Sequence, residues 1–303
     1  MSAILVPFGD DGGIDWSAFE AHVARTHAAG LTPAVNMDTG YVQLLGHDDQ
    51  ATALRIARSV TDGGKGFVAG AYVADGAGDA YDARATVAAA ERVLAHGGTP
   101  VVFPSHGLNS LDDAGWVAAM EHLGEGLDRF IGFELGDMFV PHGRIVGLDA
   151  YRGLLGVDAC IGAKHSSLSR SAEWQRLALR DELRPDFEVF TGNDLAIDMV
   201  VYGSDYLLGL STCAPDLFAQ RDRLWAEGDD RFWEVNDLLQ YLGMFAFRPP
   251  VPAYRHDAAM FLHLRGWART DHVPDGVPRR PDSDRPVLAD IAARVERMVA
   301  ELS

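Results

Sequence analysis

Apolar and amphipathic segments alternate along most of the chain. The segment DWSAFEAHVARTHAAG places apolar side chains at Trp16, Phe19 and Val23, close to the 3.6-residue period of a helix, and Gly30 ends it. The short apolar segment LTPAVN follows, as expected of a buried strand. Because this order of helix, glycine and strand recurs down the chain, the pattern predicts a repeated β/α unit.

Eight strands are predicted, at nearly regular spacing. They begin near residues 3, 33, 66, 100, 130, 158, 187 and 206. Strands that alternate with helices form a parallel sheet, because each helix returns the chain to the same end of the sheet. Eight such units predict an α/β fold, a closed eight-stranded parallel β/α (TIM) barrel over residues 1–227. An open doubly wound sheet is the competing fold, but no glycine-rich phosphate loop follows the first strand.

Residues 228–303 are predicted to form a C-terminal helical extension. Three segments carry helical patterns: DRFWEVNDLLQYLGMFAF, AYRHDAAMFLHLRGW and PVLADIAARVERMVAEL. The proline-rich segments PPVP and VPDGVPRRPDSDRP are expected to be turns or linkers between them.

The composition is that of a soluble globular protein, with 48% hydrophobic and 23% charged residues among 303. A net charge of -18 argues against nucleic acid and anionic membrane surfaces as partners. The opening MSAILVPFGDDGG lacks the basic residues of a signal peptide, and no apolar run reaches the roughly 18 residues of a membrane span. Cys160 and Cys213 give no disulfide framework, so we expect a reduced, cytoplasmic protein.

Lysine is scarce in this chain. Of 26 basic residues only Lys65 and Lys164 are lysines, and Lys164 ends the apolar segment ACIGAK of the sixth predicted strand. Arginine keeps its proton, whereas a buried lysine can become a neutral amine. A lysine at this position therefore predicts a nucleophile that forms a Schiff base. The alternative is a lysine that extends its ammonium group to solvent. Around Lys65, DGGKGF lacks the serine or threonine and the first glycine of a phosphate loop.

Polar residues follow most of the predicted strands. In a β/α barrel the active site lies at the carboxyl ends of the strands, so these residues are expected to converge on one polar pocket. They are Asp38, Thr39, Tyr41, Ser105, His106, Glu134, Asp137, His142, Arg144, Lys164, His165, Asn193, Asp194, Ser211 and Thr212. Simpler roles stay open: Asp38 and Thr39 can form a turn, and Asn193 or Asp194 can cap the next helix.

The sequence resembles the dihydrodipicolinate synthase and N-acetylneuraminate lyase superfamily over nearly its whole length. The resemblance rests on five segments in the family's order: VPFGDDGGIDWSAFEAHV, NMDTGY, IGAKHSS, TGND and PVPAYRHDAAMFLHLRGW. They take the places of the family's Thr-Pro-Phe opening, Asn-Gly-Thr-Thr-Gly-Glu turn, Gly-Ile-Lys-Asp-Ser-Ser strand, Ser-Gly-Asp-Asp turn and late Pro-Val-Lys helix. The resemblance implies a class I, Schiff-base-forming barrel that assembles as a homodimer or homotetramer.

The departures from the family pattern concern proton transfer. The family's pair of threonines is here Asp38 and Thr39, and FELGDMF has no tyrosine where the family has one near the end of strand five. No tyrosine occurs near FPSHG either, where the family's cross-subunit tyrosine falls. Glu134 is the nearest group able to transfer a proton. Arg144 matches an arginine that attracts a distal carboxylate in the family, although it can also pair with Asp137 or Glu134.

We therefore predict a lyase of the aldolase or dehydratase type that acts on a 2-oxo acid or related carbonyl compound, without a cofactor or metal. Dihydrodipicolinate synthesis itself is not expected. The predicted catalytic residues are Lys164, Glu134 and Thr39. The residues predicted to contact the substrate are Asp38, Tyr41, His106, Arg144, His165, Gly192 and Asn193.

Two alternatives use the same barrel. The first is a divalent-metal-dependent sugar isomerase or aldolase, for which the chain offers oxygen and nitrogen ligands. Its candidate ligands are Glu134, Asp137, His142, His165 and Asp194. The second is a family member that has lost catalysis and binds a metabolite.

Overall fold

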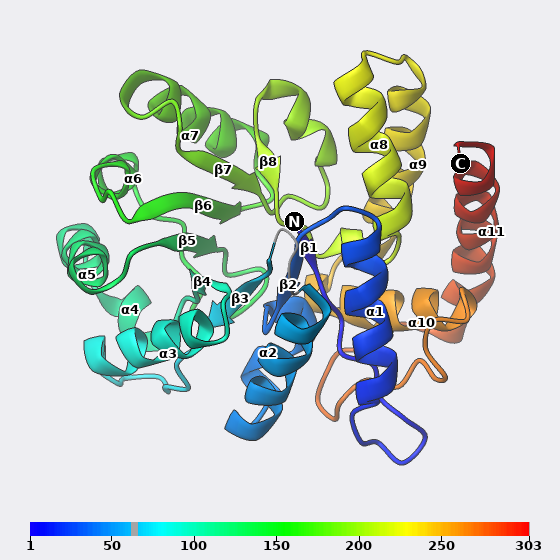
Figure 1. Cartoon of the computed structure of the whole chain (residues 1–303), viewed down its shortest axis with the longest axis horizontal. Helices are drawn as coiled ribbons and strands as arrows, with labels where there is room; N and C mark the ends of the chain where they lie inside the picture. Colours follow the sequence, from blue (N-terminus) through cyan, green and yellow to red (C-terminus); the bar gives the residue numbers. More distant parts are fainter. Residues whose placement is uncertain (62–65, 303) are drawn as a thin grey trace.

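The computed structural model describes residues 1–61 and 66–302, and its strands form one parallel barrel in sequence order (Figure 1). The strands are β1 (Ser2–Ala3), β2 (Pro33–Val35), β3 (Val68–Ala71), β4 (Thr99–Val102), β5 (Phe130–Leu135), β6 (Cys160–Ser166), β7 (Glu188–Thr191) and β8 (Asp205–Tyr206). A parallel bridge between Ser2 and Leu208 joins the first strand to the chain after the last. The predicted TIM barrel is confirmed, and each strand begins within two residues of its predicted start.

Helices cover the outside of the barrel (Figure 1). They are α1 (Trp16–Ala28), α2 (His47–Thr61), α3 (Ala83–Ala95), α5 (Asp113–Gly126), α6 (Leu148–Leu155), α7 (Arg170–Leu183) and α8 (Pro215–Glu227). Asp15, Asp82, Asp112 and Ser169 begin four of them, because each side chain accepts a hydrogen bond from a first-turn amide. Lys65 and the glycines predicted to end α2, at positions 63 and 64, lie outside the described residues.

Short helices occupy the loops at the carboxyl ends of several strands. They are η1 (Asp38–Gly40), η2 (Val42–Leu44), α4 (His106–Ser110), η3 (Ile197–Tyr202) and η4 (Leu210–Thr212). The segment LAIDMVVYG, predicted as a helix, forms the 3-10 helix η3. These turns carry several of the residues predicted for the site.

The C-terminal helices α9 (Arg231–Ala246) and α11 (Arg285–Leu302) pack beside α8 (Figure 1). The other helices of the extension are η5 (Val251–Ala253), α10 (Tyr254–Leu264) and η6 (Asp282–Asp284). The predicted boundary falls at Gly228, whose left-handed conformation ends α8. Leu239, Phe247 and Leu288 lie in the same hydrophobic core as Val35 of β2, so the extension and the barrel share buried apolar surface. Among the described helices, none has the length and apolar character needed to cross a membrane.

Candidate active site

Lys164 faces the inside of the barrel because of its place in strand β6. It lies beside Phe133 of β5 and Phe190 of β7 in the strand register. Its neighbour His165 lies beside Glu134 of β5. Successive side chains of a strand point to opposite faces, so Lys164 and the two phenylalanines share the inner face, while His165 and Glu134 share the outer one.

The amine of Lys164 is buried and unpaired. The residue is only 6% exposed, and its Nζ lies 4.6 Å from the centre of the Phe133 ring. Within the described part of the chain, this amine has neither a hydrogen bond nor an ion pair. Burial lowers the pKa of Lys164 to about 8, although Asp194 and Asp38 act to raise it. About a tenth of the lysine is then neutral at pH 7, against about one molecule in three thousand for a free side chain.

Gly192 lets the end of β7 approach the lysine. A Cβ at this position would lie 2.9 Å from Cε of Lys164 and 2.0 Å from Oγ of Ser166. Any side chain would therefore displace Lys164 or Ser166. The structure supports a role for Gly192 in shaping the site through this close contact.

Asp38 and Thr39 are held by the C-terminal extension. Tyr254, the first residue of α10, donates a hydrogen bond to Oδ2 of Asp38 at 3.0 Å and lies 2.9 Å from Oγ1 of Thr39. Nη1 of Arg255 lies 3.4 Å from Oδ1 of Asp38. Burial raises the pKa of Tyr254 well above its usual value, so its hydroxyl stays protonated and donates to the carboxylate. Sequence analysis missed Tyr254 and Arg255, because these contacts join residues more than 200 positions apart.

Asp194 is a second carboxyl group close enough to influence Lys164. The residue is 3% exposed, and its Oδ1 accepts a hydrogen bond from the amide of Leu210 at 2.7 Å. Burial raises the pKa of Asp194 to about 7, against the opposing effects of the Leu210 amide and Lys164. The preceding residue, Asn193, closes a local turn, because its side-chain oxygen accepts the amide of Leu195 at 3.1 Å.

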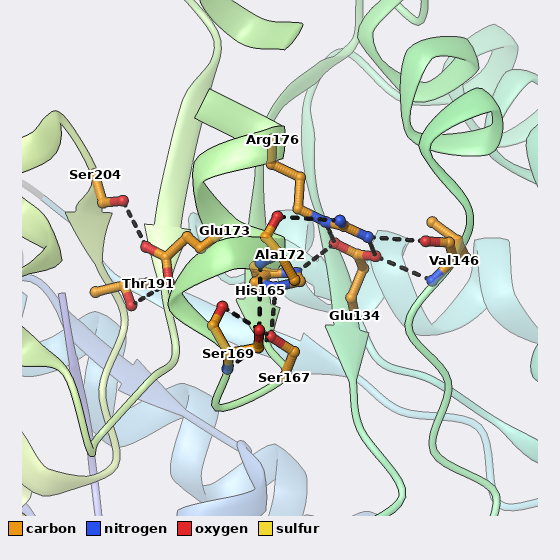
Figure 2. A network of polar contacts seen from close by, with 10 residues as sticks. All are labelled: Glu134, Val146, His165, Ser167, Ser169, Ala172, Glu173, Arg176, Thr191 and Ser204. Carbon is orange, nitrogen blue, oxygen red and sulfur yellow. Dashed lines mark hydrogen bonds and ion pairs between the residues drawn. The ribbon is translucent and has the colours of Figure 1, made fainter. Parts of the chain in front are cut away.

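Glu134 does not reach the inner face of the barrel, which corrects its prediction as the acid or base. Figure 2 shows its carboxylate between β5 and α7, where Arg176 donates to both oxygens at 2.7 and 2.8 Å. His165 Nδ1 lies 2.8 Å from the same carboxylate, and the Val146 amide donates to it at 3.1 Å. Despite burial, which raises it, the hydrogen bonds from Arg176 and His165 lower the pKa of Glu134 to about 2. A fully bonded carboxylate on the outer face cannot exchange protons with a substrate at Lys164.

His165 is corrected for the same reason. Its ring lies on the outer face, with Nδ1 toward Glu134 and Nε2 2.7 Å from Oγ of Ser167 (Figure 2). Both ring nitrogens are therefore engaged in the layer between strands and helices. These contacts indicate a structural role for His165 rather than the predicted contact with a substrate at Lys164.

Arg144 is also committed elsewhere. Its guanidinium group pairs with Asp113 at the start of α5 and donates to the carbonyl of Leu111. Leu111 lies just before α5 and Asp113 is its first residue, so the structure pairs this arginine there and not toward a distal carboxylate as predicted. Its acidic partner is neither Asp137 nor Glu134.

Two further predicted residues have clear surroundings. The ring of His106 stacks on His142 with centroids 3.9 Å apart, and its backbone amide donates to Asp75 at 2.8 Å. Tyr41 is fully buried against Phe8, with ring centroids 5.7 Å apart. The structure places neither side chain in contact with Lys164 through a hydrogen bond, so their roles toward a substrate stay predictions.

The ligands of the metal alternative do not come together. Glu134 and His165 lie on the outer face of the barrel wall, whereas Asp194 lies near Lys164. Across residues 1–61 and 66–302, no three His, Cys, Asp or Glu side chains are arranged to hold a metal ion. The geometry of the candidate ligands therefore gives this alternative no support.

Comparison with known proteins identifies the fold. No protein-family model matches the chain, and neither does any curated protein sequence. Among solved structures, dihydrodipicolinate synthase from Thermotoga maritima matches with a TM-score of 0.79 and 18% identity, over 100% of this chain and 98% of that one. The E. coli K12 prophage protein YagE of the dihydrodipicolinic acid synthase family, in complex with pyruvate, matches with 0.79 and 16%, over 97% and 98%.

A third match gives the same result. Dihydrodipicolinate synthase from Aquifex aeolicus has a TM-score of 0.78 and 16% identity, over 97% of each chain. The chain therefore has the fold of the dihydrodipicolinate synthase family, including the helical extension, and the predicted resemblance is confirmed at that level. Identities this low establish the shared fold and leave the chemistry to be argued from the site.

Glu134→Gln should lower the free energy of unfolding and should have no direct effect on catalysis. Removing one partner of a buried ion pair leaves the other charge uncompensated, at a cost of about 3 kcal/mol or more. The folded pKa of Glu134 is depressed to about 2, so its stabilisation is present above the ordinary glutamate pKa and is lost as the pH falls toward 2. Urea unfolding followed by circular dichroism measures both effects.

The matched control is Glu182→Gln, since Glu182 forms a 3.9 Å ion pair with Arg152 at the surface. This change should alter stability by less than about 1 kcal/mol. A Glu134→Gln protein with unchanged stability and greatly reduced turnover would return Glu134 to a catalytic role.

Proposed function

We propose that this protein is a Schiff-base-forming lyase of the class I aldolase type, with Lys164 as its nucleophile. The observation that carries the proposal is the burial of an unpaired lysine amine, with a lowered pKa, on the inner face of the barrel. The similar structures support it, because they are described as dihydrodipicolinate synthases and as a family protein in complex with pyruvate.

The chemistry follows from the neutral amine. Lys164 attacks the carbonyl carbon of the substrate, and the oxygen leaves as water while a C=N bond forms. The resulting iminium draws electrons from an adjacent C–C or C–O bond, which then breaks. The Phe133 ring, 4.6 Å from Nζ, stabilises positive charge on the nitrogen through its π-face.

The substrate is a 2-oxo acid or a related small carbonyl compound, and the reaction is not dihydrodipicolinate synthesis. Phe133, the residue of β5 beside Lys164, carries no hydroxyl group for proton transfer. The Asp38 carboxylate acts electrostatically on the lysine and disfavours a second carboxylate at the same place, so a 2-oxo acid has to bind with its carboxylate away from Asp38. Arg144 does not compensate, since it pairs with Asp113.

The proposal includes assembly as a homodimer or homotetramer in the cytoplasm. Trp174 of α7 and Tyr202 of η3 pack edge to face, with centroids 5.5 Å apart, and are 44% and 54% exposed. Exposed aromatic residues of this kind are enriched at interfaces between subunits. The free thiols of Cys160 and Cys213, both buried, are in keeping with a reducing compartment.

Reductive trapping tests the nucleophile. The protein is incubated with pyruvate, hydroxyacetone, dihydroxyacetone and glyceraldehyde, and each mixture is reduced with borohydride. We expect a mass increase that peptide mapping assigns to Lys164, because reduction converts the imine to a stable secondary amine. Lys164→Arg should abolish the adduct, and Lys65→Arg should retain it. Binding without any adduct would favour the metabolite-binding alternative instead.

A standard assay tests the exclusion of dihydrodipicolinate synthesis. With pyruvate and aspartate semialdehyde as substrates, we expect turnover far below the ordinary enzymatic range of about 1 to 1,000 per second. The physical reason is the lack of a hydroxyl group on Phe133. Turnover within that range would show that another group supplies the proton and would overturn this part of the proposal.

A further inference from the structure

Two carboxyl groups, those of Asp38 and Asp194, affect the pKa of Lys164, and they have different hydrogen-bond partners. Both Asp38 and Asp194 are buried and both raise the pKa of the lysine. Tyr254 and Arg255 occupy the two oxygens of Asp38. In the described part of the chain, the Asp194 carboxylate receives only backbone amides, with Leu210 at 2.7 Å.

The different partners of Asp38 and Asp194 give the two carboxyl groups different abilities to exchange a proton. The Arg255 guanidinium group and the Tyr254 hydroxyl both bind the Asp38 carboxylate, so both of its oxygens already have a side-chain partner. Among residues 1–61 and 66–302, no side-chain cation forms an ion pair with Asp194, and burial raises its pKa to about 7. A carboxyl group with a pKa near the working pH can both take and return a proton. The two carboxyl groups therefore lie in different environments, and the environment of each group decides what it can do.

The position of Asp194 fits a proton carrier at the lysine. Gly192 brings the end of β7 against the lysine, since a Cβ there would lie 2.9 Å from Cε of Lys164, and Asp194 follows two residues later. The titratable groups of other elements that interact electrostatically with Asp194 are Lys164 on β6, Tyr254 on α10 and Cys213 after η4. Burial raises the pKa of Tyr254 and Cys213, so both are neutral, and Lys164 is the charged group opposite Asp194.

We propose that Asp194 moves the protons that the imine chemistry at Lys164 requires, an inference that rests on the proposed function. The Asp194 carboxylate takes a proton from the carbon next to the iminium carbon. The C–H electron pair becomes the C=C bond of an enamine, and the C=N pair moves onto the Lys164 nitrogen. In the reverse step the Asp194 carboxylic acid returns the proton to carbon. Asp38 is held by Tyr254 and Arg255 and takes no part in this proton transfer.

The test separates imine formation from proton transfer. Asp194→Asn keeps an oxygen that can accept the Leu210 amide and removes the titrating proton. Two readouts are taken in D2O with pyruvate and with hydroxyacetone, each of which has a methyl group next to its carbonyl. Borohydride trapping at Lys164 measures imine formation, and proton NMR measures deuterium entry into the methyl group of the probe.

The two readouts should move in opposite directions. Removing the Asp194 charge lowers the pKa of Lys164 further, so trapping at pH 7 should rise several-fold, up to about tenfold. Deuterium exchange per adduct should fall about a hundredfold, as expected for loss of a general acid–base group. In the wild-type protein the exchange rate per adduct should decline as the pH falls below about 7, and in the variant the rate per adduct should lack this decline. Asp237→Asn, an exposed charge removal on α9, should change neither readout.

Each contrary result has a distinct meaning. A fall in both readouts would indicate a structural role for Asp194 and would overturn the inference. Unchanged exchange with a retained adduct would do the same, as would exchange lost in Asp38→Asn but kept in Asp194→Asn. If the wild-type protein gives no adduct at Lys164 with either probe, the proposed function itself fails.

Discussion

The desolvation of one ammonium group is the constraint on which this site depends. Moving the pKa of Lys164 from 10.5 to about 8 costs the folded chain about 3 kcal/mol at neutral pH. Because the folded-state pKa is lowered, the cost is complete below about pH 8 and disappears above the ordinary lysine pKa. In return for this loss of stability, a larger fraction of Lys164 is a neutral amine at a fixed position. The Phe133 ring and the charges of Asp38 and Asp194 reduce the cost without closing an ion pair that would hold the amine protonated.

The surrounding structure holds that amine from two sides. On the outer face, the Glu134 carboxylate bonds to Arg176 and His165, which ties β5 and β6 to α7 next to the lysine. On the other side, α10 reaches over the barrel end and fixes Asp38 and Thr39 through Tyr254. The C-terminal extension therefore takes part in the site as well as in the core. The hydrogen bonds of the Glu134 network are all made and hold β5 and β6 in place. Asp194 has fewer partners, and in our proposal it is the group that transfers protons.

The fold could be predicted from the sequence, and Lys164 could be singled out as a candidate nucleophile, because each leaves a local signal. The spacing of strands and glycines predicted the barrel, and the scarcity of lysine singled out Lys164. The errors come from information that is not local. Glu134 was assigned by its closeness to a strand end, but the register between β5 and β6 places it beside His165 on the outer face. Contacts between Tyr254 and Asp38 span 216 positions, and no periodicity in the chain indicates them.

The ionisation of Lys164 tests the account most directly. The chain has only two lysines, so protein labelled with carbon-13 at lysine Cε should give two resonances, which Lys65→Arg assigns. When the two chemical shifts are followed as a function of pH, we expect the Lys164 resonance to titrate near pH 8. A midpoint near the ordinary value of about 10.4 would mean that the amine is solvated or paired. The structural basis of the proposed nucleophile would then be contradicted.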